Sequence, residues 1–154
     1  MSGLVNETIP ANVIVDVGEL LSEGETIFVS STQSGVGVMV KTLEKGGKTP
    51  AYEGVLEISK EDGSYKIINE LSLETYLKYV VPSEMPSSYP KEALKAQAVC
   101  TRTYALRQIQ EKRLEKYQAD VDDTINFQVY AHISPQKTTT QAVKDTMGQI
   151  TLRI

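Results

Sequence analysis

The sequence predicts an α+β fold, in which a small antiparallel β-sheet or barrel is followed by a helical region with one long helix. Two observations support this prediction. Nine of the ten glycines lie before residue 64, and glycine marks turns between strands while it weakens helix interiors. From Lys91 to well past Glu115 the chain has neither glycine nor proline, which favours an uninterrupted helix. A chain of 154 residues fits one domain. We divide it into a β-rich part (1–70), a helical part (71–118) and a C-terminal part (119–154).

Short runs rich in β-branched and aromatic residues predict the strands. Apolar and polar residues alternate in the run from Tyr52 to Ser59, as in a strand with one solvated face. Glu61-Asp62-Gly63 predicts a tight hairpin turn after it. The expected strands are therefore residues 12–17, 26–30, 36–42, 52–59 and 65–69.

The helical part is expected to begin near Ser72. Serine is a favourable N-cap, and Glu74 in the first turn suits the helix dipole. Pro82 and Pro86 are expected to break the chain within a few residues of each other. This would place residues 83–85 on a short, stiff connector.

The long helix should start at Pro90, a residue well suited to a first helical turn. Small and apolar side chains at helical spacing then predict one stripe that packs closely against other elements. The stripe consists of Leu94, Ala98, Thr101 and Ala105, whereas Arg102, Gln108 and Lys112 are expected to point elsewhere.

Composition excludes several classes of function. Sixteen Lys and Arg residues against twenty Asp and Glu give a net charge of −4, so we expect no nucleic-acid partner. The single cysteine, Cys100, excludes an intrachain disulfide and a multi-cysteine zinc site. No apolar run is long enough for a membrane span, and the first residues do not have the pattern of a signal peptide.

Two stretches resemble a known family. The first is LSLETYLKYVVPSEMP at residues 71–86, and the second is YPKEALKAQAVCTRTYAL at residues 89–106. Together they closely resemble the stage II sporulation protein D/LytB amidase-enhancer family. The resemblance continues more weakly through residues 123–124, 128–130, 142–143 and 146–148.

The resemblance implies a lytic transglycosylase that cuts peptidoglycan glycan strands between N-acetylmuramic acid and N-acetylglucosamine. Its product has a 1,6-anhydro end, and its role is in sporulation or cell-wall remodelling, on glycan already stripped of stem peptides in the sporulation case. The alternative is a non-catalytic cell-wall-binding module that enhances a partner amidase. Either role places the protein outside the cytoplasm, in the cell envelope, with glycan strands and an amidase as expected partners and no cofactor.

The family's proposed catalytic acid is the glutamate of its E-M-P motif, which corresponds to Glu84. In this reaction the sugar's own 6-hydroxyl attacks, so one carboxyl group can serve first as acid and then as base. An ordinary glycosidase needs two carboxylates. The apolar neighbours of Glu84 in the sequence favour the protonated form of its carboxyl, which could then donate to the leaving oxygen. The alternative is a loop glutamate that forms an ion pair with Lys95 or Arg102.

Lys95 and Arg102 are seven residues apart and share a face of the long helix. The resemblance makes both residues candidates to line the glycan cleft. The guanidinium of Arg102 is better suited to directional contacts than the ammonium of Lys95. The alternative is a solvated helix face. Tyr104, Tyr89 and Tyr130 could stack on sugar rings, but a position in the core or at its rim is more common for a tyrosine.

The chain departs from the family pattern in two places. Some sporulation members carry C-D-T-T-H-C-Q-V-Y, which suits zinc, where this chain has D-D-T-I-N-F-Q-V-Y at residues 122–130. We therefore predict no metal, and a surface or loop position for the lone histidine, His132. The second departure is length: the family domain continues past residues 150–154, which resemble the start of a strand. We therefore expect a domain truncated at its C-terminus, whose unpaired strand could promote a homo-oligomer.

Overall fold

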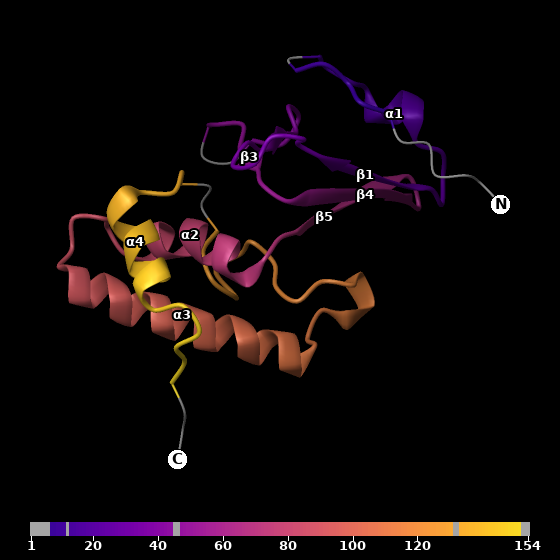
Figure 1. Cartoon of the computed structure of the whole chain (residues 1–154). Coiled ribbons are helices and arrows are strands. Elements are labelled where there is room, and N and C mark those ends of the chain that lie inside the picture. The colour runs from indigo at the N-terminus through magenta and orange to yellow at the C-terminus, as the bar shows by residue number, and fades with distance from the viewer. Residues whose placement is uncertain (1–6, 12, 45–46, 131–132, 152–154) are drawn as a thin grey trace.

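The computed structural model describes residues 7–11, 13–44, 47–130 and 133–151. It has the predicted α+β architecture, with small antiparallel sheets followed by helices (Figure 1). In chain order the elements are α1 (Val17–Leu20), β1 (Thr26–Ser30), β2 (Val38–Met39), β3 (Ala51–Tyr52), β4 (Val55–Glu61), β5 (Ser64–Glu70), α2 (Leu73–Glu84), α3 (Lys91–Glu111), the 3₁₀ turn η1 (Glu115–Tyr117) and α4 (Lys137–Asp145).

The larger sheet has three antiparallel strands in the order β1-β4-β5. Ile58 of β4 lies opposite Ile27 of β1 and Ile67 of β5. The predicted hairpin turn is confirmed, because Asp62 and Gly63 both have positive φ angles, of 51° and 71°. Two such residues define the tight turn whose twist matches that of paired strands. The second sheet pairs only β2 with β3, and the two sheets and α1 share a core around Leu21, Tyr52, Leu56 and Ile58.

The first predicted strand is wrong. Residues 13–16 have no regular structure and α1 begins at Val17, while residue 12 lies outside the described residues. The Asp16 side chain accepts a hydrogen bond from Gly18 N at 2.8 Å, and such a cap favours a helical turn over an extended strand. The predicted strand 52–59 is divided into β3 and β4 because Gly54 adopts a φ of 86° between them.

Helix α2 begins as expected, since the Ser72 side chain accepts a hydrogen bond from Thr75 N at 3.3 Å. It does not end at Pro82, however, and the predicted connector at residues 83–85 is wrong for all but Met85, the C-cap. Pro82 lies close to the end of the helix, where the missing N–H costs one bond rather than disrupting a long ladder. The Ser83 hydroxyl also donates to Tyr79 O at 2.7 Å, in the same turn as Pro82.

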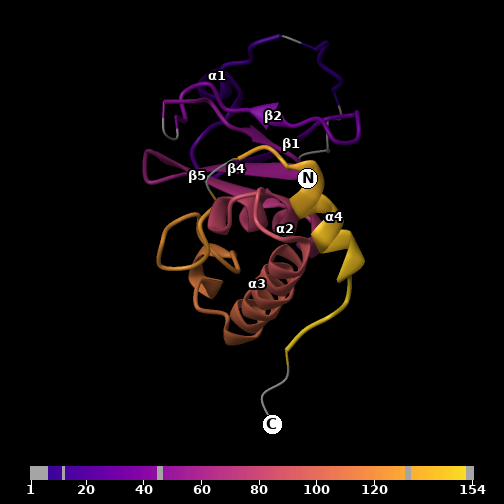
Figure 2. The same cartoon turned by 90° about the vertical axis from the view of Figure 1, so that its left-hand side faces the viewer.

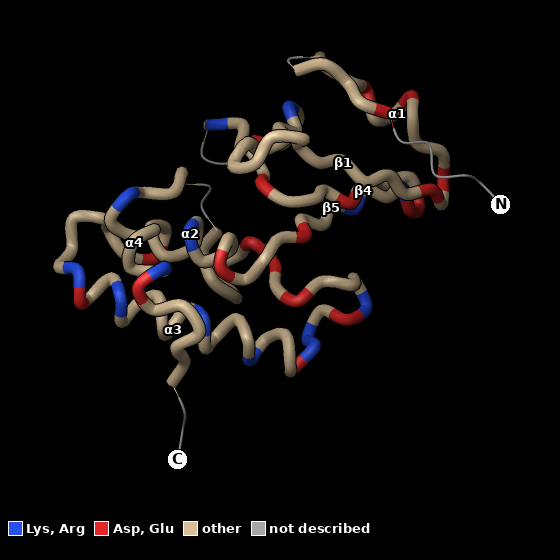
Figure 3. Tube along the Cα trace, viewed as in Figure 1, with Lys and Arg blue, Asp and Glu red and all other residues tan. Residues whose placement is uncertain are grey.

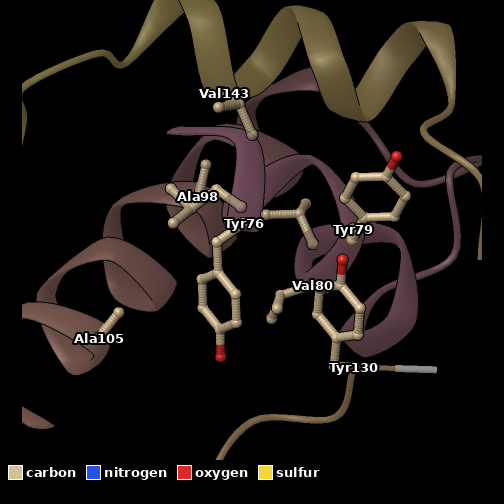
Figure 4. Packing of buried hydrophobic residues seen from close by; sticks show 9 residues of the cluster. Tyr76, Tyr79, Val80, Ala98, Ala105, Tyr130 and Val143 are labelled. Carbon is tan, nitrogen blue, oxygen red and sulfur yellow. The ribbon is translucent and has the colours of Figure 1, made fainter. Parts of the chain in front are cut away.

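Helix α3 starts directly after Pro90 and ends where Lys112 turns left-handed, with a φ of 50°. Its predicted stripe is confirmed, because Leu94, Ala98, Thr101 and Ala105 are all buried. Arg102 and Gln108 are buried as well, which contradicts the prediction that they point elsewhere. The stripe packs against α2 and α4, and Figure 4 shows Ala98, Ala105 and Val143 together with tyrosines from α2 and from the segment before α4.

Helices α2, α3 and α4 lie together on one side of the larger sheet, with α2 between the sheet and α3, and α1 lies on the other side (Figures 1 and 2). Glu53, between β3 and β4, links the two parts because the Tyr79 hydroxyl of α2 donates to its Oε1 at 2.6 Å. In the part of the chain that the structure describes, no helix is long and apolar enough to cross a membrane.

Candidate functional site

Glu84 is the last residue of α2, and its side chain is exposed. Its Oε1 accepts a hydrogen bond from the main-chain N–H of Val129 at 2.8 Å. Its Oε2 has no hydrogen-bond partner among the residues that the structure describes. The apolar neighbours Val81 and Pro82 are buried in the core. The helix therefore directs those side chains inward and leaves the carboxylate facing solvent.

A polar cluster surrounds this end of the molecule. Tyr76 lies about two turns before Glu84 on α2, and its hydroxyl donates to Gln128 Oε1 at a long 3.5 Å. Burial raises the pKa of Tyr76, and the nearby Tyr104, Glu84 and Asp122 raise it further. Groups from α2, from α3 and from the segment after α3 thus come together around one buried hydroxyl.

Of the predicted substrate contacts, Tyr104 lies in this cluster, and Lys95 is on the same helix. Tyr104 is half-buried. The ammonium of Lys95 pairs with Glu92 Oε1 at 3.0 Å, and its side chain is partly exposed. Basic residues are distributed along α3 and the turn that follows it (Figure 3). Residues 91–117 hold seven of the sixteen Lys and Arg but only three of the twenty Asp and Glu, so this is the cationic part of a chain that is acidic as a whole.

Arg102 lies elsewhere and is buried inside the protein. Its Nε and Nη2 donate to the two carboxylate oxygens of Glu74 at 2.7 and 2.9 Å. Its Nη1 and Nη2 also donate to the carbonyl oxygens of Gln149 and Val143 at 3.1 and 3.3 Å. Glu74 precedes Glu84 by ten residues, about 15 Å along a helix axis. The structure therefore does not bring Arg102 beside Glu84, and a direct sugar contact by Arg102 stays a prediction.

The alternative interpretation of Glu84 as an ion-pair partner is wrong. Lys95 pairs with Glu92, and Arg102 pairs with Glu74. Glu84 instead bonds to a main-chain amide.

The remaining tyrosine candidates have different positions. Tyr130 is 8% exposed and stacks on Tyr76 with ring centroids 5.8 Å apart, so it belongs to the core. Tyr89 is 51% exposed. It borders a surface hollow of about 190 Å³ between the start of α3 and α4, which is also lined by Lys91, Leu94, Thr138 and Gln141.

The segment that aligns with the zinc motif forms a local turn here. Asp122 Oδ1 accepts hydrogen bonds from Thr124 N at 2.8 Å and from Thr124 Oγ1 at 2.6 Å. The Arg113 guanidinium lies over the Phe127 ring, 4.9 Å from its centroid. Within the described ranges no three His, Cys, Asp or Glu residues gather as a metal site would require. The absence of zinc stays a prediction, and His132 lies outside the described residues.

Sequence reasoning missed four members of the site: Tyr76, Asp122, Gln128 and Val129. The Q-V-Y run at residues 128–130 was a signal, since it is part of the resemblance, but nothing in it indicated a role. The contribution of Val129 is a main-chain N–H, which every non-proline residue carries. Only the folded chain shows where that donor points.

Comparisons with known proteins confirm the family resemblance of the helical part. Residues 61–152 match the family model described as "Stage II sporulation protein" (SpoIID). Stage II sporulation protein D of Bacillus subtilis is 38% identical over 127 residues, covering 73% of this chain and 37% of that protein. The amidase enhancer of Bacillus subtilis is 43% identical over 74 residues, covering 48% of this chain and 9% of that protein.

An uncharacterized protein of Brachyspira hyodysenteriae is 46% identical over 79 residues, covering 51% of this chain and 21% of that protein. The chain thus spans well under half the length of each of these relatives. No solved structure matches the chain significantly.

Proposed function

The chain belongs to the SpoIID family of stage II sporulation proteins, and from this premise we propose that it is a peptidoglycan lytic transglycosylase domain with Glu84 as its acid and base. The substrate is the glycan strand, cut between N-acetylmuramic acid and N-acetylglucosamine in sporulation or cell-wall remodelling. This proposal places the protein in the cell envelope.

The reaction needs only one carboxyl group. The protonated Glu84 gives its proton to the glycosidic oxygen while the C1–O bond breaks and its electron pair goes to that oxygen. The 6-hydroxyl of the same N-acetylmuramic acid then bonds to C1 through its oxygen, and the Glu84 carboxylate takes the hydroxyl proton. The carboxyl ends as it began, and no external water is consumed.

One observation carries the proposal. Glu84 has one carboxylate oxygen held at 2.8 Å by Val129 N–H, while the other is uncommitted among the described residues. A general acid must reach the leaving oxygen directly, and an exposed carboxylate at a helix end meets that requirement. A carboxylate enclosed in an internal ion pair would not.

The surroundings suit a glycan without stem peptides, whose lactyl groups are free carboxylates. Five of the seven basic side chains of residues 91–117 are held in ion pairs, but Lys and Arg still outnumber Asp and Glu in this region, and this excess attracts such an anion. Within it, Lys95 offers an ammonium that could leave its exposed partner Glu92, and Tyr104 offers a half-buried ring near the cluster. Tyr104 and Lys95 are the substrate contacts that we propose. They are nine residues apart and lie on opposite sides of α3, so they would contact different parts of a strand. Arg102 supports the helices that carry them.

The test is product analysis by mass spectrometry after incubation with glycan strands stripped of stem peptides. We expect wild type to form 1,6-anhydromuramyl ends and Glu84→Gln to form none. Glu115→Gln is the matched control, because Glu115 is an exposed glutamate that pairs with Lys112 at the surface. If Glu84→Gln gives the same product profile as wild type, the assignment of Glu84 is refuted.

The second candidate is a non-catalytic wall-binding module that enhances a partner amidase. It is favoured by the similarity of about half of the chain to the amidase enhancer of Bacillus subtilis. If wild type and Glu84→Gln both sediment with purified cell walls and neither forms anhydro ends, this candidate replaces the first.

A further inference from the structure

We infer that the main-chain N–H of Val129 is a positioning group for Glu84, which fixes Oε1 so that Oε2 carries the proton in both steps. The inference rests on the proposed transglycosylase function and adds to it the identity of the working oxygen. Glu84 and Val129 are separated by 45 residues, so their contact depends on how the segment after α3 folds back on α2.

The segment around Val129 is anchored on both sides. Gln128 and Tyr130 are each 8% exposed, and both turn into the helical core. Gln128 Oε1 accepts from the Tyr76 hydroxyl at 3.5 Å, and Tyr130 stacks on the Tyr76 ring at an interplanar angle of 11°. Figure 4 shows Tyr130 beside the side chains of α2.

Both anchors contact Tyr76, which is on the same helix as Glu84. The Val129 N–H and the Glu84 carboxylate, which form the 2.8 Å bond, are therefore both held in position by helix α2. Movements of α2 as a whole carry the Val129 amide with the Glu84 carboxylate and leave their distance unchanged.

The bond matters because of where Glu84 lies. A glutamate at the end of a helix and facing solvent samples several rotamers, and restricting it costs conformational entropy. A main-chain N–H to a carboxylate is a strong, charge-assisted bond, and it holds the side chain in one orientation before substrate arrives. With Oε1 accepting from Val129, the proton of the neutral acid resides on Oε2. That oxygen then donates to the glycosidic oxygen and recovers a proton from the 6-hydroxyl.

The hydrogen bond itself can be tested without activity, by measuring hydrogen exchange of the Val129 amide in two-dimensional NMR. An amide that donates to an acceptor is protected from exchange with solvent. We expect the Val129 amide to exchange slowly in wild type and faster in Glu84→Ala, which removes the acceptor. Asp122→Asn is the control and should keep the wild-type rate. An exchange rate that is unchanged in Glu84→Ala overturns the inference.

The catalytic role is tested by replacing Val129 with the corresponding α-hydroxy acid, which removes the N–H and keeps the side chain. We expect kcat for formation of anhydro ends to fall about tenfold or more, as for other losses of orientation at a reacting group, while KM changes by less than about twofold. The same replacement at Val15, in the exposed N-terminal segment, is the control.

The outcomes separate this inference from the proposed function. If Glu84→Gln is inactive but the variant with the α-hydroxy acid in place of Val129 keeps the wild-type kcat, the proposed function stands and the positioning role is refuted. If wild type itself forms no anhydro ends, the proposed function fails, and the inference fails with it.

Discussion

Replacing Arg102 with methionine should destabilise the protein strongly, because this side chain joins three helical segments at one buried point. Arg102 is 1% exposed. It binds Glu74 of α2 with two charge-assisted bonds of 2.7 and 2.9 Å, and it reaches the carbonyls of Val143 on α4 and Gln149 beyond it. Methionine keeps the length of the stem and loses all of these donors.

The size of the expected loss of stability follows from the different exposure of Arg102 and Glu74. Breaking a buried ion pair by removing one partner costs about 3–5 kcal/mol, since the other charge stays behind without compensation. The Glu74 side chain keeps 26% of its surface exposed and can recover some water, so the lower half of this range is expected for Arg102→Met. For a chain of this size the loss corresponds to a fall in Tm on the order of 10 °C. Glu74→Leu should cost more, because it leaves the guanidinium buried.

Thermal unfolding followed by circular dichroism checks this prediction, with Arg107→Met as the matched control on the same helix. Arg107 pairs with Glu111 at 2.6 Å, but its side chain is 73% exposed, and exposed pairs contribute little. If Arg102→Met and Arg107→Met have the same Tm, the buried contacts of Arg102 do not stabilise the helices. If Arg102→Met keeps the wild-type Tm and loses affinity for glycan strands, the predicted sugar contact is the better account of Arg102.

Three further predictions concern the rest of the fold. Burial raises the pKa of Tyr52 to about 12 and also raises the pKa values of Tyr76, Tyr79 and Tyr130. The stability that these buried neutral phenols contribute should therefore be complete below about pH 10, where a tyrosine in the unfolded chain ionises. Above that pH the free energy of unfolding should decline. Melts between pH 8 and 11, with tyrosinate absorbance as a second signal, would contradict this if Tm stayed constant. Gly54→Ala should cost more than Gly24→Ala in urea unfolding. Both positions have positive φ, but only at Gly54 would a Cβ overlap a backbone oxygen, that of Glu70. Protein purified without chelator should contain well below one equivalent of zinc by elemental analysis, and a stoichiometric metal would contradict our interpretation of residues 122–130.

The parts of the fold that were predictable from the sequence depend on local chemistry. The Asp62-Gly63 turn, the Ser72 cap and the buried stripe on α3 each follow from residue preferences within a few positions. The end of α2 was mispredicted for a related reason. Proline is a strong local signal for a helix end, yet close to the C-terminus of a helix its cost is small, and the Ser83 hydroxyl supplies a donor to Tyr79 O.

The site itself was predictable only in part, because its contacts are long-range. The motif identified Glu84 and Tyr104, whereas its partners Val129, Gln128 and Asp122 come from a segment that folds back over α2. Spacing placed Lys95 and Arg102 on one helix face. It could not show that Arg102 is buried against Glu74, since that depends on which face α2 and α4 cover.

The exposure of Glu84 corrects one expectation from the sequence. The apolar neighbours of Glu84 in the sequence suggest an apolar pocket around its carboxyl, but Val81 and Pro82 are buried in the core and do not enclose it. The end of α2 turns those side chains inward and leaves the carboxylate facing solvent. In the proposed reaction the bound glycan strand therefore has to supply the exclusion of water that the free protein does not.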